Sequence, residues 1–251
     1  MSRSHGYRCF LEPDAWTGDR AELDADESTH LARVLRAEIG DEVTLFDGCG
    51  TDAPARIVAM DGKLAILEIG DRQEAPPPAT TLELVQGLPR RATMDLIVQK
   101  ATELGVARIA PLLVERTVSR IPVSQRLERS KRWRRIAIES AKQCGNARVP
   151  EILPVATLNE WAGQPPGDRR IVLASLAANA PPLANVLENI REAAPPAVAL
   201  IIGPEGDFSA DEMEQFRSVG AMECSYGDQV LRSDTAALYG LSILHHTLSE
   251  G

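Results

Sequence analysis

The chain has few of the residues that bind metals or form disulfides. Only four of its 251 residues are cysteines, widely spaced and without a CxxC pair: Cys9, Cys49, Cys144 and Cys224. No histidine stands near them at ligand spacing, and the adjacent His245 and His246 would point to two sides of a helix. The sequence therefore predicts reduced thiols and no metal site.

Long hydrophobic runs are missing as well. The first residues, MSRSHGYRCFLEPD, lack the apolar core of a secretory signal, and no apolar run approaches the roughly 20 residues that span a bilayer. A hydrophobic content of 44% and a charged content of 25% are ordinary for a globular protein. We expect a cytoplasmic protein with no membrane partner.

Two common nucleotide-binding signatures are also absent. The chain contains no GxxxxGKS or GxxxxGKT sequence, which excludes a phosphate-binding P-loop. No GxGxxG follows the first strand expected after residue 80, so a dinucleotide-binding dehydrogenase has no support.

Positive charge is scarce overall but locally concentrated. The formal net charge is −9, yet residues 90–148 contain 14 basic and five acidic side chains between two acidic segments. A local field of this kind attracts a polyanion even when the net charge is negative. The block favours an anionic partner such as nucleic acid, although residues 126–140, RLERSKRWRRIAIES, could also form a solvated helix face.

The first 75 residues predict a small β-barrel. Three strand patterns end at glycines, in residues 42–48, 55–62 and 63–70, and a short helix is expected to begin at a capping Ser28. The proline run at 76–79 cannot continue a strand or a helix, so we expect a stiff linker there. The predicted domains are residues 1–75 and 80–251.

Residues 80–251 alternate between strand and helix patterns. The expected strands are 81–86, 108–113, 171–174, 197–202 and 222–226, and the expected helices are 93–104, 126–143, 183–191, 210–219 and 234–248. This alternation predicts an α/β domain with a mostly parallel sheet covered on both faces. Ligands of such sheets bind beyond the C-terminal ends of the strands.

Two stretches of this domain predict a pocket. In LIIGPEGDFS (200–209) an apolar strand ends in a loop bracketed by glycines, where unpaired backbone amides can hold a polar ligand. In QVLRSDTAALYGLSIL (229–244) Arg232 precedes Ser233, Asp234 and Thr235, which are good helix-capping residues. Together they indicate a small-molecule pocket beside one fixed cation, whereas either motif alone could be a structural turn.

The order of these motifs resembles the ribosomal RNA small subunit methyltransferase E family of the SPOUT methyltransferases. HLARVLRAEIGDEVTLFDGCG (30–50) is similar to the family's N-terminal PUA-like barrel, and RRATMDLIVQKATELGVARIAPLLVERTV (90–118) to the start of its catalytic domain. RWRRIAIESA (132–141), leading into QCG (143–145) and RVPE (148–151), is a further matching block. The resemblance covers most of the chain.

This resemblance implies a fold, a reaction and a site. It implies a SPOUT-type α/β domain with a deep trefoil knot, working as a homodimer that transfers a methyl group from S-adenosylmethionine to N3 of a uridine in 16S rRNA of the small ribosomal subunit. The cofactor would lie among three loops, 173–175, 203–206 and 226–232. Matched onto this chain, the implied cofactor-binding residues are Leu173, Ala174, Ser175, Ile202, Gly203, Pro204, Glu205, Gly206, Tyr226, Val230, Leu231, Arg232, Thr235 and Ala236.

The chain departs from the family pattern at three places. Asn146-Ala147 stands where Arg-Asn is usual, which removes a cation from an expected RNA-facing loop unless Arg148 compensates. Asp207 replaces a frequent glycine, and Ser233-Asp234 replaces a common Thr-Glu, a chemically mild change.

Two residues are the catalytic candidates. Uridine N3 must lose its proton before it can attack, so Arg232 is expected to stabilise the resulting charge, unless it pairs with Glu205 or Asp234. Glu205 is the acidic candidate, either as proton acceptor or as a residue that fixes loop geometry.

The expected RNA contacts come from arginines, although scattered surface arginines are the alternative for each. They are Arg3, Arg8, Arg33, Arg36, Arg90, Arg91, Arg116 and Arg148, with Arg120 as a further phosphate contact. Two other functions stay open: a SPOUT enzyme that modifies another base or a ribose, and a ribosome assembly factor without catalytic activity.

Overall fold

The computed structural model describes residues 6–61, 64–117, 121–165 and 167–249. The chain divides into two compact units, Met1–Pro77 with Ile138–Val149, and Pro78–Ala137 with Pro150–Gly251. The sequence placed residues 138–149 with the second domain. They join the first unit because Ile138 and Ala141 pack against Phe10 and Phe46, whose rings meet edge to face with centroids 5.6 Å apart.

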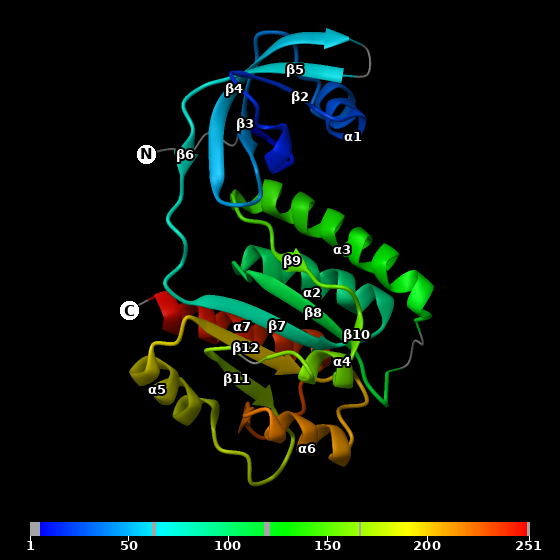
Figure 1. Ribbon diagram of the computed structural model, residues 1–251, viewed down its shortest axis with the longest axis vertical. Helices are drawn as coiled ribbons and strands as arrows, with labels where there is room; N and C mark the ends of the chain where they lie inside the picture. Colours follow the sequence, from blue (N-terminus) through cyan, green and yellow to red (C-terminus); the bar gives the residue numbers. More distant parts are fainter. Residues whose placement is uncertain (1–5, 62–63, 118–120, 166, 250–251) are drawn as a thin grey trace. The chain divides into compact units, whose positions relative to one another are not determined.

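The first unit contains one mainly antiparallel sheet (Figure 1). Its strands run in the order β1-β3-β4-β5-β2, β6 pairs with β4, and only β1 pairs with β3 in parallel. The elements are β1 (Tyr7–Phe10), the 3-10 turn Pro13–Ala15, β2 (Arg20–Glu22), β3 (Glu42–Phe46), β4 (Thr51–Asp61), β5 (Leu64–Ile69) and β6 (Gln73–Glu74). The three expected strands correspond to β3, β4 and β5, whereas β1, β2 and β6 are too short to produce an alternating pattern.

The first helix begins earlier than the sequence predicted. Helix α1 (Ala25–Thr29) is capped by Asp24, whose carboxylate accepts a 2.7 Å hydrogen bond from the backbone N–H of Glu27, and a π-helical turn, His30–Val34, follows. The prediction that Ser28 caps this helix was wrong. Its buried hydroxyl instead donates to the Leu23 carbonyl at 3.1 Å and accepts from the Ala65 N–H at 2.9 Å, which joins the helix to β5.

The second unit is built on a parallel sheet, as the sequence predicted. Its strand order is β10-β8-β7-β12-β11-β13, with β9 beside β8, and every pairing is parallel. The strands are β7 (Thr81–Gly87), β8 (Arg108–Leu113), β9 (Glu151–Ile152), β10 (Ala156–Thr157), β11 (Arg169–Ala174), β12 (Ala197–Ile202) and β13 (Met222–Cys224). Two of them, β9 and β10, were missed because each has two residues.

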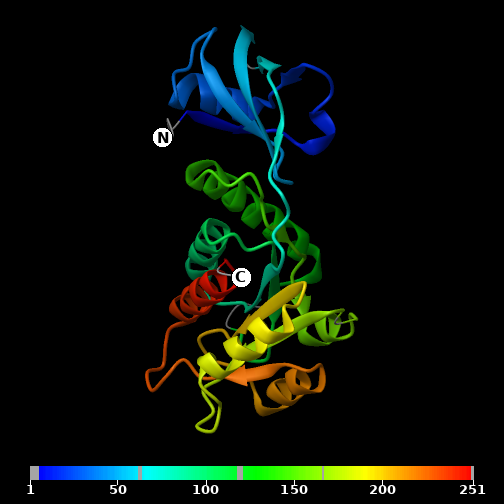
Figure 2. The same cartoon turned by 90° about the vertical axis from the view of Figure 1, so that its left-hand side faces the viewer.

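Helices cover both faces of this sheet (Figures 1 and 2). Helices α2 and α7 lie on one face and α4 and α6 on the other, because successive β12 residues point to opposite sides: Ile201 packs in the core with Phe208 and Phe216, whereas Leu200 faces α7. The helices are α2 (Arg91–Glu103), α3 (Val123–Cys144), α4 (Leu158–Ala162), α5 (Leu183–Ala193), α6 (Ala210–Ser218) and α7 (Ser233–Ser249). Only α4 was not expected, since a single capped turn is too short for a periodic pattern.

Candidate functional site

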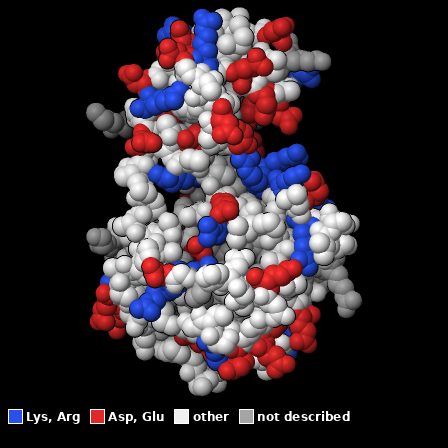
Figure 3. Space-filling view, viewed as in Figure 1, with Lys and Arg blue, Asp and Glu red and all other residues white. Residues whose placement is uncertain are grey.

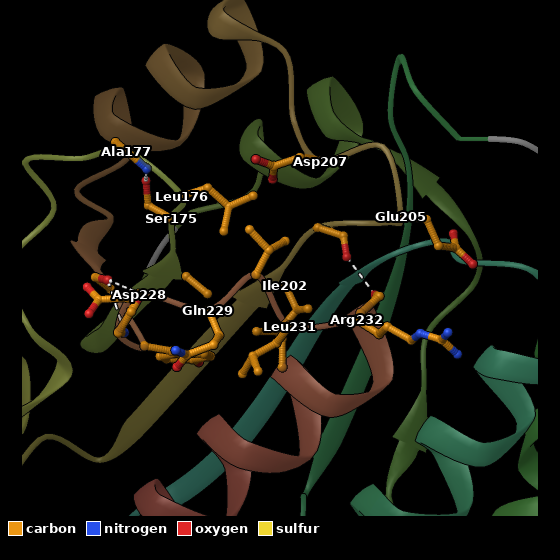
Figure 4. A pocket seen from close by; sticks show the side chains of 18 of the residues that line it. Ser175, Leu176, Ala177, Ile202, Glu205, Asp207, Asp228, Gln229, Leu231 and Arg232 are labelled. Atoms are coloured by element: carbon orange, nitrogen blue, oxygen red, sulfur yellow. Dashed lines mark hydrogen bonds between the residues drawn. The ribbon is translucent and has the colours of Figure 1, made fainter.

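A cavity of about 570 Å³ lies beyond the C-terminal ends of β11, β12 and β13 (Figure 4). Three segments line it, within residues 174–178, 202–207 and 225–236. Small side chains such as Ala174, Ala177 and Ala178 form part of its wall and bring the backbone close to the cavity. Its volume is that of a site for a cofactor-sized molecule.

The structure brings most of the expected cofactor-binding residues together around this cavity. The exceptions are Leu173, which is fully buried in the core, and Gly206 and Thr235, which do not line the cavity. The lining also includes residues outside the implied cofactor-binding set: Leu176, Ala177, Ala178, Asp207, Ser225, Gly227, Asp228, Gln229 and Ser233. Gly227, Asp228 and Gln229 lie within the expected loop 226–232, and most of the others directly adjoin expected residues.

The GPEG loop (203–206) is held by protein groups on two sides. Glu205 accepts a 3.1 Å hydrogen bond from the backbone N–H of Arg90, the residue that precedes α2. Arg116 donates to the Gly206 carbonyl oxygen at 3.1 Å, and the Asp207 N–H closes the turn onto the Pro204 carbonyl at 3.0 Å. The loop is therefore fixed before any ligand binds.

Gly87, at the end of β7, allows the same loop to approach the sheet closely. A Cβ at this position would lie 2.6 Å from Cδ of Pro204 and 2.9 Å from its nitrogen, closer than real Cβ atoms approach other atoms. Pro204 is itself buried. Any side chain at position 87 would push the loop away from β7.

Asp207 occupies a left-handed backbone conformation, with φ of 58°. Glycine is the usual residue in this region, and aspartate is among the few others that adopt it readily. The departure from the family's glycine is thus compatible with the same loop path. It adds a carboxylate to the cavity wall.

The carboxylate of Glu223 contacts the first lining segment of the cavity, residues 174–178, through Ser175. Glu223 of β13 pairs with Arg217 at 2.6 Å and interacts with the hydroxyl of Ser175, which also accepts from the Ala177 N–H at 3.2 Å. Burial raises the pKa of Glu223, but the hydrogen bonds from Ser175 and Arg217 outweigh burial and hold its pKa below the ordinary value. The charged carboxylate therefore orders the turn at Ser175.

Tyr226, in the third lining segment, packs its phenol against α7. Its ring lies 5.2 Å from that of Tyr239, and its hydroxyl is buried without a hydrogen-bond partner among the described residues. Burial, followed by the nearby Cys224 and Tyr239, raises the pKa of this phenol, so it stays neutral. The ring fits because residue 240 is glycine: a Cβ there would overlap the phenolic oxygen.

Arg232 and Glu205 lie at one side of the cavity, opposite Asp228 and Gln229 (Figure 4). The Arg232 side chain is exposed and extends away from Leu231. Within the described part of the chain it makes no ion pair with Glu205 or Asp234, the alternative role that the sequence left open. Its charge is available to a ligand.

The expected RNA-contacting arginines have different surroundings. Arg33 and Arg36 of the first unit are exposed, as are Arg90 and Arg91 of the second. Figure 3 also shows Lys and Arg side chains gathered over α3. Arg3 and Arg120 lie outside the described residues.

Three other arginines of this group have protein partners. Arg8 lies 3.8 Å from Asp52 and stacks on Phe46, and Arg116 holds the Gly206 carbonyl. Arg148 donates to the carbonyls of Cys49 and Ala75, while Asn146 accepts from its backbone N–H at 2.9 Å.

The described residues hold no group of three His, Cys, Asp or Glu side chains arranged as metal ligands. The four cysteines form no disulfide within these same ranges. Among the helices described, none is both long enough and apolar enough to cross a membrane.

Comparisons with known proteins agree with the two-unit organisation. A family model described as an RNA methyltransferase domain matches residues 76–245, and one described as an RNA methyltransferase PUA domain matches residues 23–70. The ribosomal RNA small subunit methyltransferase E of Aquifex aeolicus is 30% identical over 213 residues, 84% of this chain and 88% of that protein. Its namesake from Bacillus subtilis is 25% identical over 227 residues, 89% of each chain.

Two solved structures are similar over almost the whole chain. A protein from Legionella pneumophila described as a methyltransferase, in complex with bound cofactor SAM, has a TM-score of 0.85 at 30% identity and covers 96% of this chain and 97% of its own. Ribosomal RNA small subunit methyltransferase E from Neisseria gonorrhoeae, bound to S-adenosyl methionine, has a TM-score of 0.85 at 27% identity, covering 96% and 98%. The chain belongs to the ribosomal RNA small subunit methyltransferase E family.

Proposed function

We propose that this protein transfers the methyl group of S-adenosylmethionine to N3 of a uridine in 16S rRNA of the small ribosomal subunit. The observation that carries the proposal is the cavity at the strand ends, built from three loops, with the exposed guanidinium of Arg232 at its edge. The names of the relatives and the cofactor bound in two similar structures support it.

The cavity suits S-adenosylmethionine in size and lining. About 570 Å³ lies within the range of cofactor sites, and glycines and alanines expose backbone donors and acceptors along the wall. When bound, the cofactor supplies an activated methyl group on a positively charged sulfur. The residues of this chain have to align the uridine with it, a contribution of roughly 7–11 kcal/mol when the orientation is fixed.

Arg232 is proposed to stabilise the deprotonated base. Loss of the N3 proton places negative charge on the uridine O2 and O4 atoms, and a fixed guanidinium beside them favours that form. Glu205 lies at the same side of the cavity as Arg232. Two roles are proposed for it, proton acceptor and loop-fixing residue, and the hydrogen bond that it accepts from the Arg90 N–H supports the second.

RNA would be held by basic side chains on each unit. Arg33 and Arg36 on the first unit are exposed, which supports a docking role, as does the gathering of basic side chains over α3. Binding of RNA fits the match of residues 23–70 to a PUA domain.

Finer features of the architecture are also proposals. The first sheet would close into a PUA-like barrel, residues 76–79 would be the linker, and the loops around the cavity would form a trefoil knot. Exposed Leu96 and Tyr239 on α2 and α7 support a homodimer, which light scattering on the purified protein would test. A ribosomal substrate would place the protein in the cytoplasm.

Mass spectrometry of rRNA from cells with and without this protein tests the reaction. The proposal expects one N3-methyluridine in 16S rRNA that disappears with the gene and returns with it. A mark on another base or on a ribose would replace the proposed target, and no lost mark would favour an assembly factor without catalytic activity.

A further inference from the structure

A chain of hydrogen bonds runs from β7 to the cavity wall and ends on the GPEG loop. The amide Nε2 of Gln86 donates to the hydroxyl oxygen of Ser233 at 3.0 Å, and this hydroxyl donates to the Gly203 carbonyl oxygen at 2.6 Å. The three residues come from β7, the start of α7 and the loop after β12. Gln86 is fully buried and Ser233 is 6% exposed, so water does not compete for these bonds.

The orientation of the Gln86 amide is set by its neighbours. Its Nε2 also donates to the Gly87 carbonyl at 2.9 Å and lies 3.4 Å from the carbonyl oxygens of Ile202 and Gly203. Turning the amide over would place its oxygen against these acceptors, which have no proton to share.

The oxygen atom of the Gln86 amide lowers the stability of the fold. This Oε1 atom is buried and has no hydrogen-bond partner among the described residues. An unpaired buried acceptor destabilises a protein, so it offsets part of the stability that the hydrogen bonds of Nε2 contribute.

The hydrogen bonds of Gln86 and Ser233 bear on the position of Arg232. Ser233 directly follows Arg232, and Gly203 begins the loop that carries Glu205 at the same side of the cavity. The Arg232 side chain makes no ion pair in the described ranges, so its place at the cavity is set by its backbone. The hydroxyl of Ser233 thus links the backbone that carries Arg232 to the neighbouring GPEG loop.

We propose that Gln86 and Ser233 are positioning residues, which hold the Gly203 carbonyl and the backbone of Arg232 in the arrangement that cofactor binding and methyl transfer need. This inference rests on the proposed function and adds two residues that act through the backbone they hold. Gly87 contributes to the same junction, because its missing side chain lets Pro204 lie against the end of β7.

The test uses full-length Ser233→Ala, Ser233→Thr and Gln86→Met proteins. Calorimetry gives Kd for S-adenosylmethionine, steady-state kinetics on small-subunit RNA gives kcat and KM, and thermal unfolding gives Tm. A matched control is Ser130→Ala, which removes an equally buried serine hydroxyl that donates to the Leu153 carbonyl, away from the cavity.

Ser233→Ala should weaken cofactor binding and lower kcat, by about tenfold for the two effects multiplied together, the effect of one net hydrogen bond. Ser233→Thr keeps the hydroxyl and should restore both to within about twofold. Gln86→Met removes the amide donor to Ser233 and should act in the same direction as Ser233→Ala, and the double variant should be no worse than the worse single variant. Ser130→Ala should lower Tm and leave Kd unchanged.

Wild-type Kd and kcat in Ser233→Ala would overturn the inference, and so would a Ser233→Thr protein as impaired as Ser233→Ala. An effect on Tm alone, as in the control, would reduce both residues to a structural role. Failure of the wild-type protein itself to bind S-adenosylmethionine would instead overturn the proposed function.

Discussion

The carboxylate of Glu205 accepts a 3.1 Å hydrogen bond from the backbone N–H of Arg90, at the N-terminus of α2. Arg90 is the N-cap residue of α2, and its own side chain makes no capping hydrogen bond. Glu205 therefore supplies a side-chain acceptor at the start of this helix. The third residue of the GPEG loop thus has a structural partner 115 residues away in sequence.

Replacing Glu205 separates its two proposed roles. Glu205→Gln keeps an oxygen acceptor for the Arg90 N–H, and we expect kcat/KM within about threefold of wild type, whereas Glu205→Ala should cost about 0.5–2 kcal/mol of stability, as lost helix caps do. Urea unfolding and single-turnover kinetics measure the two effects. A loss of about 100-fold or more in Glu205→Gln, with normal stability, would instead identify a proton acceptor.

Arg232→Ala should remove most of the methyltransferase activity and leave the stability of the protein nearly unchanged. The side chain is exposed, so its removal leaves packing intact, but the charge on the uridine loses its partner. We expect kcat to fall by about 10²–10³, the usual effect of removing a donor to developing negative charge. Near-normal turnover accompanied by a lower Tm would contradict the assigned role.

Gly240→Ala should destabilise the second unit because of Tyr226. The new Cβ would overlap the buried phenolic oxygen and approach Cδ2 of Leu200 to 2.8 Å. Overpacking of this kind costs about 1–3 kcal/mol. Because Tyr226→Phe removes the overlapping oxygen, thermal unfolding should show the double variant to be more stable than Gly240→Ala alone, and strict additivity would argue against this contact.

Acid should weaken the fold partly through Glu223. Because the folded protein holds its pKa below the ordinary value of 4.5, the ionised carboxylate stabilises the folded state above that pH, and this contribution is lost as pH falls through the folded-state pKa. Below about pH 4.5 the Tm of wild type should fall more steeply than that of Glu223→Gln. Parallel curves for the two proteins would contradict the assignment.

Charge reversal on the first unit tests RNA docking. Arg33→Glu and Arg36→Glu should each weaken RNA binding, more at low salt than at high salt, and should reduce the slope of log K against log salt by about one per lost phosphate contact. Arg20→Glu is the control, since it makes the same charge change at another exposed site of that unit. Binding unchanged by all three would exclude the unit as a docking surface.

Much of the fold could be predicted from the sequence because its signals are local. Strand β12 is an uninterrupted apolar run that ends at Gly203, and its bounds were predicted as observed, as were those of β8. The parallel sheet followed from strand and helix patterns that alternate. Short elements such as β9 and α4 have too few residues for a periodic pattern. Asp24 caps α1 through a local bond to Glu27, a role predicted for Ser28 because both are capping residue types.

The candidate site divides in the same way. The sequence by itself determined its two motifs, the lone Arg232 beside them and the family, because glycine-bracketed loops and helix starts are written in consecutive residues. Only the tertiary structure decided which groups hold these motifs in place. The hydrogen bonds join Arg90 to Glu205, Gln86 to Ser233, and Ser233 to Gly203. Each pair joins segments that are distant in the chain. They meet because β7 and β12 are neighbours in the parallel sheet and α7 packs against both strands, so no local sequence pattern could have predicted these contacts.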